Sequence, residues 1–220
     1  MKTLPAKGKI RGFTLIEVLV VVAVIFVLAA LMLPTLDHTH TSRGPSCMSN
    51  QKQICLGLIM SQGDNDGKFP WQRSTATNGT MKLITNGQAA SQLYPLTDYL
   101  KSFGCYLCPV DSGKVEATNY DHFTDQNISY FVNVDATTNT AATILTGDRH
   151  LIANGNPVKP GLFYYKDTSN LSWSRGLHGT GERTVGVMGF ADGHAEMVKT
   201  TDLNGVFHRQ GLVSDRMEVP

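Results

Sequence analysis

The chain has 220 residues, of which 41% are hydrophobic and 17% are charged, and its formal net charge is +1. This length suits one compact domain with a short appendage, and the composition excludes a disordered chain and a polytopic membrane protein. A net charge so close to zero leaves no excess of cations for a long phosphate backbone, so we expect no nucleic-acid partner.

The first dozen residues form a basic segment. Four positive charges, Lys2, Lys7, Lys9 and Arg11, precede residue 13 with no acidic residue among them. Because the excess positive charge is concentrated at one end, residues 1–12 are predicted to be a separate leader peptide.

An apolar segment follows the leader. Val18 to Leu33 are sixteen residues without a charge, and a helix of that length spans about 24 Å, less than a bilayer core. Adding residues 13–17 gives about 31 Å, which predicts one crossing over residues 13–34, with Glu17 inside it. The leader then stays in the cytoplasm and residues 35–220 lie outside. A secretory signal peptide is the alternative, but its apolar core is usually shorter.

Glu17 is the unusual residue of this segment. A carboxylate costs about 2.5–3.5 kcal/mol at the centre of a membrane helix, less near the interface, so it needs a partner. The run Gly12-Phe13-Thr14-Leu15-Ile16-Glu17, between a basic leader and an apolar helix, resembles the processing site of type IV pilins and of type II secretion pseudopilins.

The resemblance implies a structural role. In that family a prepilin peptidase would cut between Gly12 and Phe13 and methylate the new amine of Phe13, and Glu17 would pair with the Phe13 amine of a neighbouring subunit. The implied partners are the peptidase, other pilin or pseudopilin subunits in homo- or hetero-filaments, and an inner-membrane assembly platform. The implied location is the bacterial inner membrane, crossed once, with a periplasmic C-terminal domain that joins a filament after assembly.

The expected fold class is α+β and pilin-like. A long N-terminal helix, half transmembrane and half amphipathic, would pack on an antiparallel β-sheet. Pro34 would either loosen this helix or end it. Gly44-Pro45 would interrupt it unless the proline opens a new helix. From Ser46 onward an amphipathic helix is predicted, with these residues on one side: Cys47, Gln51, Ile54, Cys55, Leu58 and Ile59.

The four cysteines of an exported chain are expected to form disulfides. Cys47 and Cys55 cannot pair on a helix, because eight residues rise about 12 Å. A bond from the helix to the Cys105–Cys108 loop and a bond within that loop both stay open. Zinc binding and thiol redox chemistry at Cys105 and Cys108 are alternatives.

Other polar residues are weaker candidates for a metal site. Asp64-Asn65-Asp66-Gly67 forms a solvated turn or supplies oxygen ligands to calcium, and no other cofactor is expected. The stretches over residues 46–70, 93–102 and 105–111 resemble a pseudopilin-like subgroup that also carries a C-terminal His…Asp-Gly signature. Here His178 lies farther from Asp192-Gly193 than the subgroup spacing.

The C-terminal half is predicted to be strands without a helix, at Ile128–Val134, Ala142–Thr146, Gly161–Lys166, Thr184–Phe190 and His194–Lys199. Asp192-Gly193 is predicted to be a two-residue hairpin turn with positive φ at both positions.

A pilin-like filament subunit, most of all a type II secretion pseudopilin, is the leading hypothesis. The alternatives are a type IV pilus subunit for adhesion, motility or DNA uptake, and a membrane-tethered metal-binding module or enzyme. The last would use His150, His178, Asp192 and His194, but no motif places nucleophile and base together, so we expect no enzyme.

Overall fold

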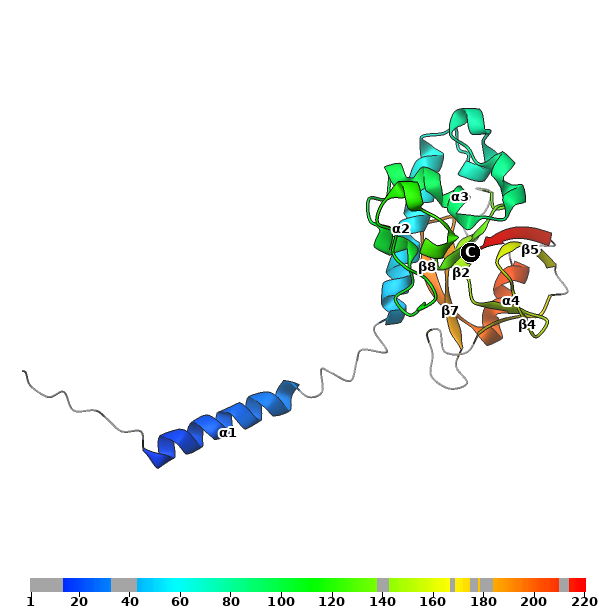
Figure 1. The fold of residues 1–220 in the computed structure, drawn as a ribbon. Helices are drawn as coiled ribbons and strands as arrows, with labels where there is room; N and C mark the ends of the chain where they lie inside the picture. The colour runs from blue at the N-terminus through cyan, green and yellow to red at the C-terminus, as the bar shows by residue number, and fades with distance from the viewer. Residues whose placement is uncertain are drawn as a thin grey trace, which may run out of the picture. The chain divides into compact units, whose positions relative to one another are not determined.

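The computed structural model describes residues 14–32, 43–137, 143–166, 169–174, 178, 184–209 and 214–220. The chain divides into two units, Met1–Thr41 and Ser42–Pro220, and each is described by itself. The first contains helix α1 (Leu15–Met32), and the second contains all the other elements (Figure 1).

Apart from Glu17, helix α1 consists of apolar residues around its whole circumference. Every side chain described in it is exposed, and the large apolar ones range from 44% exposed at Val22 to 83% at Leu15. Among the described residues, no helix combines the length and apolar character that crossing a bilayer requires.

Helix α2 (Arg43–Gly63) opens the second unit. Pro45 lies in its first turn, where the missing N–H of proline is tolerated because that N–H has no partner within the helix. The alternative in which this proline opens a new helix is confirmed. The link from α1 to α2, with Pro34 in it, lies outside the described residues.

One side of α2 is buried, as the periodicity predicts. The buried side chains include Cys47, Gln51, Ile54, Cys55 and Leu58, and Ile59 is half-buried. This side packs against strand β7 (Val185–Phe190).

The approach of α2 to β7 is close. Gln51 Nε2 donates to the carbonyl oxygen of Val187 at 2.9 Å. A Cβ at Gly189 would come within 2.4 Å of Cys55 Sγ, so glycine is required where this helix meets the sheet.

The main sheet has six antiparallel strands in the order β5-β9-β1-β2-β7-β8. Besides β7 they are β1 (Tyr130–Asn133), β2 (Ile144–Asp148), β5 (Gly161–Lys166), β8 (Ala195–Lys199) and β9 (Ser214–Val219). A second antiparallel sheet has the order β4-β3-β6 and consists of β4 (Asn156–Pro157), β3 (Leu151–Ala153) and β6 (Leu171–Trp173). The five predicted strands are confirmed as β1, β2, β5, β7 and β8, and four others were not predicted.

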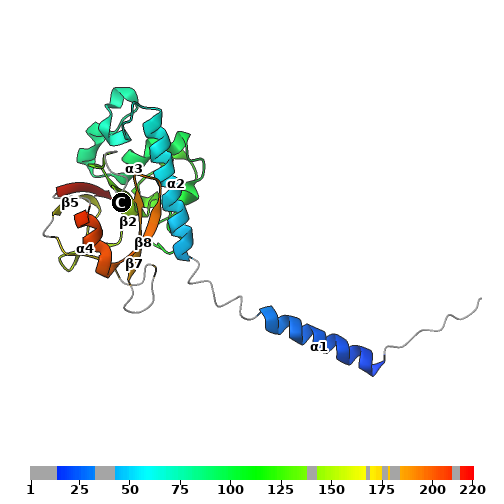
Figure 2. The same ribbon diagram turned by 180° about the vertical axis from the view of Figure 1, so that it is seen from behind.

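Both faces of the main sheet are covered, and successive strand residues alternate between two cores. Leu145 and Val187 belong to the core that contains α2, whereas Ile144 and Met188 belong to the core on the opposite face. Helices α2 and α4 (Thr200–Arg209) therefore lie on opposite faces of the sheet (Figures 1 and 2). The α+β class with antiparallel sheets is confirmed.

Helix α4 contradicts the prediction of a C-terminal half without helices. Leu203, Val206 and Phe207 give it a buried stripe at helical spacing. The ring of Phe207 packs 4.8 Å from that of Tyr165 in β5. This helix has only ten residues, so its apolar period is too short to stand out in the sequence.

The segment between α2 and β1 consists of short helices and turns on the α2 side of the sheet. Trp71 anchors it, because its Nε1 donates to the carbonyl oxygen of Ala136 at 3.0 Å. The helices are η2 (Pro70–Gln72), η3 (Thr75–Thr77), η4 (Met81–Asn86), α3 (Ala89–Leu93), η5 (Tyr94–Asp98), η6 (Phe103–Tyr106), η7 (Tyr120–His122) and η8 (Asp125–Asn127).

The turn between β7 and β8 differs from the predicted two-residue hairpin. Of its residues only Gly193 has a positive φ, 87°, and Asp192 does not. Gly193 N–H donates to Phe190 O, and Phe190 N–H donates to His194 O, both at 3.0 Å. These bonds define a three-residue loop that closes through a glycine bulge, a geometry that needs one left-handed residue instead of two.

Candidate functional site

The described part of the N-terminal motif begins at Thr14. Its backbone N–H and its hydroxyl both donate to Glu17 Oε2 at 2.7 Å, and Glu17 N–H lies 3.4 Å from the Thr14 hydroxyl oxygen. This reciprocal arrangement is a capping box, which satisfies N–H groups that the first turn of a helix leaves free. Gly12 and Phe13 lie outside the described residues, so the assignment of the cleavage site stays a prediction.

Glu17 thus has a role that the sequence analysis did not foresee. Its carboxylate holds the start of α1 within a single subunit, through bonds that all converge on Oε2. Serine or threonine followed three residues later by glutamate is the sequence signal for such a cap, and Thr14-Leu15-Ile16-Glu17 carries it.

A disulfide joins Cys47, near the start of α2, to Cys108 in the loop after η6. The two cysteines lie 61 residues apart in sequence, with Cα atoms 5.1 Å apart. Of the two pairings that the sequence left open, the structure has the one from helix to loop. The exclusion of a bond between Cys47 and Cys55 is confirmed.

The other two cysteines are free and buried. Burial raises the pKa of the Cys55 thiol and raises that of Cys105 to about 12. Since the thiolate is the reactive form, burial makes both thiols poor nucleophiles. Cys105 Sγ lies 2.9 Å from the carbonyl oxygen of Ser102, while Cys108 bonds to Cys47, so the Cys105–Cys108 pair does not form a redox centre.

The loop that carries Cys108 is fixed to the end of β2 by an ion pair. Arg149 donates two bonds to the Asp111 carboxylate, at 2.7 and 2.9 Å. Burial alone would raise the pKa of Asp111, but the guanidinium of Arg149 outweighs it and lowers the pKa. His150 Nε2 lies 3.7 Å from the same carboxylate. Bidentate pairing orients the loop as well as neutralising the buried charge.

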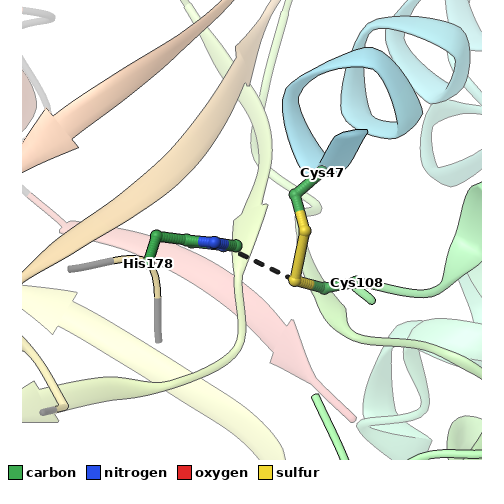
Figure 3. A group of neighbouring side chains, drawn as sticks. All are labelled: Cys47, Cys108 and His178. Atoms are coloured by element: carbon green, nitrogen blue, oxygen red, sulfur yellow. Dashed lines mark hydrogen bonds between the residues drawn. A yellow bond between two sulfur atoms is a disulfide. The ribbon is translucent and has the colours of Figure 1, made fainter. Parts of the chain in front are cut away.

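His178 completes the surroundings of the disulfide. Its side chain is fully buried, and its Nε2 lies 3.5 Å from Cys108 Sγ and 3.2 Å from Asp148 Oδ2. Figure 3 shows the imidazole pointing at the sulfur of Cys108, which the disulfide joins to Cys47 in α2. Asp148, at the end of β2, also accepts a bond from Val187 N–H at 2.6 Å. The three ligand atoms of Cys47, Cys108 and His178 lie within 4.8 Å of one another.

This group differs from the one that the sequence suggested. Within the described ranges, one group of at least three cysteine, histidine or acidic residues lies close enough to share a metal ion. Its members are Cys47, Cys108 and His178. Asp192 and His194 contact each other on the β7–β8 turn instead, where both are exposed. The contact of Asp148 with His178 had no signal in the sequence, because the two residues belong to separate segments.

Asp64 and Asp66 lie in the turn that ends α2. Asp64 Oδ2 accepts a bond from the Tyr99 hydroxyl at 3.0 Å. Asp66 and Gly67 adopt left-handed φ values of 54° and 72°. The interpretation as a turn is confirmed, and calcium binding there stays a prediction.

Comparison with known proteins gives one match. Residues 7–33 match the family model described as the prokaryotic N-terminal methylation motif. This match supports a type IV pilin-like protein that is processed by a prepilin peptidase and assembles with other pilin subunits. Neither the curated proteins nor the solved structures contain a match to the chain.

Proposed function

We propose that the chain is a structural subunit of a pilin-like filament, cut between Gly12 and Phe13 and assembled through its N-terminal helix. The match of residues 7–33 to the methylation motif carries this proposal. The apolar surface of α1 supports it, because apolar area of that extent needs lipid or neighbouring helices to cover it.

In this proposal Glu17 sets the axial register of the filament. A carboxylate buried among apolar helices is stable only with a charged or hydrogen-bonding partner. The N-methylated amine of Phe13 on a neighbouring subunit supplies that charge. The capping bonds within one subunit involve Oε2, so the carboxylate can keep its cap while it meets the amine.

The proposed location is the bacterial inner membrane. The segment over residues 13–34 crosses it once, the leader stays in the cytoplasm, and the globular unit faces the periplasm. The disulfide between Cys47 and Cys108 agrees with an oxidising compartment, where structural disulfides persist.

Among pilin-like machines, we favour type II secretion. The support is the resemblance of residues 105–111 and of the Asp192-Gly193 turn to a pseudopilin-like subgroup. The net charge of +1 gives no basic excess for DNA capture. Other pseudopilins and an inner-membrane assembly platform are the proposed partners.

The first experiment measures the intact mass and the N-terminal residue of the protein isolated from its own membrane fraction. An N-methylated Phe13 start is expected. The Gly12→Ala variant should keep the leader, because the peptidase cuts after this glycine in the proposal. A wild-type chain that starts at Met1, or near residue 30, would refute the proposed processing.

A second measurement separates the two machines. A secretion pseudopilin at its native level should stay with the cell envelope, and shearing intact cells should release none of it. Recovery of long filaments that contain the chain from the sheared fraction would favour a type IV pilus.

A further inference from the structure

The residues around the Cys47–Cys108 disulfide include the types of side chain that bind metal ions. Two cysteine sulfurs, an imidazole nitrogen and a carboxylate oxygen, those of Cys47, Cys108, His178 and Asp148, come from four separate segments. The His178 and Asp148 side chains are at most 1% exposed, and both cysteines are buried.

The distances around His178 Nε2 suit tetrahedral zinc. With zinc bonds of about 2.3 Å to sulfur and about 2.0–2.1 Å to nitrogen or oxygen, a sulfur and a nitrogen ligand lie roughly 3.6 Å apart. A nitrogen and an oxygen ligand lie roughly 3.3 Å apart. The observed separations are 3.5 Å to Cys108 Sγ and 3.2 Å to Asp148 Oδ2. The two sulfurs must separate, since they are bonded to each other, and the Asp148 carboxylate must approach them, since it lies outside the group whose ligand atoms are all within 4.8 Å of one another.

Two polar atoms of this group have no hydrogen-bond partner within the part of the chain that the structure describes. His178 Nδ1 and Asp148 Oδ1 are buried, and neither makes a hydrogen bond within the described residues. Unsatisfied buried polar atoms are uncommon and costly. The other polar atom of each side chain, Nε2 of His178 and Oδ2 of Asp148, is the one whose distances suit zinc.

We propose that reduction of the Cys47–Cys108 disulfide creates a zinc site formed by Cys47, Cys108, His178 and Asp148. A dithiol reductant supplies two electrons and becomes a disulfide, while the S–S bond breaks and gives two thiols. Zinc then binds the two thiolates, the imidazole and the carboxylate, and the two thiol protons are released. The disulfide in the oxidised state, and two sulfur–zinc bonds in the reduced state, link the start of α2 to the loop after η6.

The ligand set selects zinc over calcium. Thiolate and imidazole are preferred by zinc, whereas calcium takes six to eight oxygen ligands. Four protein ligands leave no open position, so the site is structural and activates no water. This proposal is independent of the filament function, because it concerns only the globular unit.

The test uses the full chain in detergent micelles. The protein is reduced with a phosphine, freed of reductant without air, and titrated with Co²⁺ as a spectroscopic probe. The reduced chain should bind about one equivalent, with a thiolate-to-cobalt charge-transfer band and the visible bands of tetrahedral cobalt, and Zn²⁺ should displace it. The unreduced chain should show neither band. A reduced chain without these bands would overturn the proposal.

Variants locate the site. Cys47→Ser and Cys108→Ser should remove the charge-transfer band, and His178→Ala and Asp148→Asn should weaken Zn²⁺ affinity by at least about tenfold. The Cys55→Ser/Cys105→Ser double variant and His150→Ala are matched controls that should bind as the wild type does. Circular dichroism checks the fold of each variant. Binding that survives in Cys47→Ser/Cys108→Ser, or that is lost in the folded Cys55→Ser/Cys105→Ser chain, would also refute the assignment.

Discussion

Helices α1 and α2 differ in whether their apolar side chains pack against the rest of their own unit. The side chains of α1 are exposed around the helix from Leu15 to Leu28. Helix α2 instead buries one side against its own sheet and leaves polar residues such as Lys52 and Gln53 exposed. The apolar surface of α1 therefore needs cover from outside its unit, whereas α2 finds its cover within the fold.

Because of this difference, substitutions in α1 and substitutions under α2 should affect different properties of the protein. Changes in α1 should alter what the chain joins, because membrane or neighbouring subunits bury that surface in the proposed function. Changes under α2 should alter the free energy of unfolding of the globular unit, because the burial occurs inside it. The following predictions test this separation, beginning with the largest effect.

Glu17→Ala should reduce filament assembly by a factor on the order of 100, because it leaves the neighbouring amine without its partner. The thermal unfolding of the globular unit should stay unchanged. Cross-linking of subunits in membranes measures the first effect and calorimetry the second.

Glu17→Gln is the matched control, since its side-chain oxygen can still accept the capping bonds from Thr14 but carries no charge. If pairing with the amine is the role, this variant should also assemble poorly. Normal assembly of Glu17→Gln would assign Glu17 to helix capping alone.

Replacing both disulfide cysteines, Cys47→Ser/Cys108→Ser, should destabilise the globular unit by about 4 kcal/mol. A bond that closes a span of 61 residues removes that much chain entropy from the unfolded state. Denaturant unfolding of the unreduced chain measures this, and Cys105→Ser, which breaks no disulfide, is the control. Cleavage of the leader should proceed normally in both variants.

The stability of the globular unit should fall as pH rises from about 4.5 to about 8, by an amount that depends on Glu218. Burial raises the pKa of this carboxyl from 4.5 to about 8, although Gln92 donates a bond to it. The folded state therefore keeps a proton that the unfolded state loses across this window, and above it both states are ionised.

Glu218→Gln should flatten that part of the pH profile, because the amide does not titrate. Urea unfolding of both chains at several pH values gives the difference between them. Equal pH profiles for the two chains would contradict a raised pKa at Glu218.

Gly189→Ala should destabilise the globular unit by roughly 1–3 kcal/mol, because its methyl group would collide with Cys55 Sγ beneath α2. Gly205→Ala in α4 is the matched control, since no atom lies within 4 Å of the added Cβ. That change should stabilise by about 0.5–1 kcal/mol. Thermal unfolding of both variants tests whether close packing under α2 is what Gly189 provides.

The sequence by itself determined the features that depend on neighbours along the chain. Residues 7–33 carry the methylation motif that the family model also matches. The spacing of apolar residues in α2 and the five strand-like runs of the C-terminal half predicted elements that the structure contains. Each of these signals is repeated within a few residues, so no knowledge of distant segments is needed to detect it.

Only the tertiary structure decided which distant residues meet. It paired Cys47 with Cys108, left Cys55 and Cys105 free, and placed His178 between Cys108 and Asp148. It also formed α4, whose ten residues gain their stability from packing on the sheet more than from their own helical preference. Such contacts depend on strand register and on the crossing of separate segments, which local periodicity does not encode.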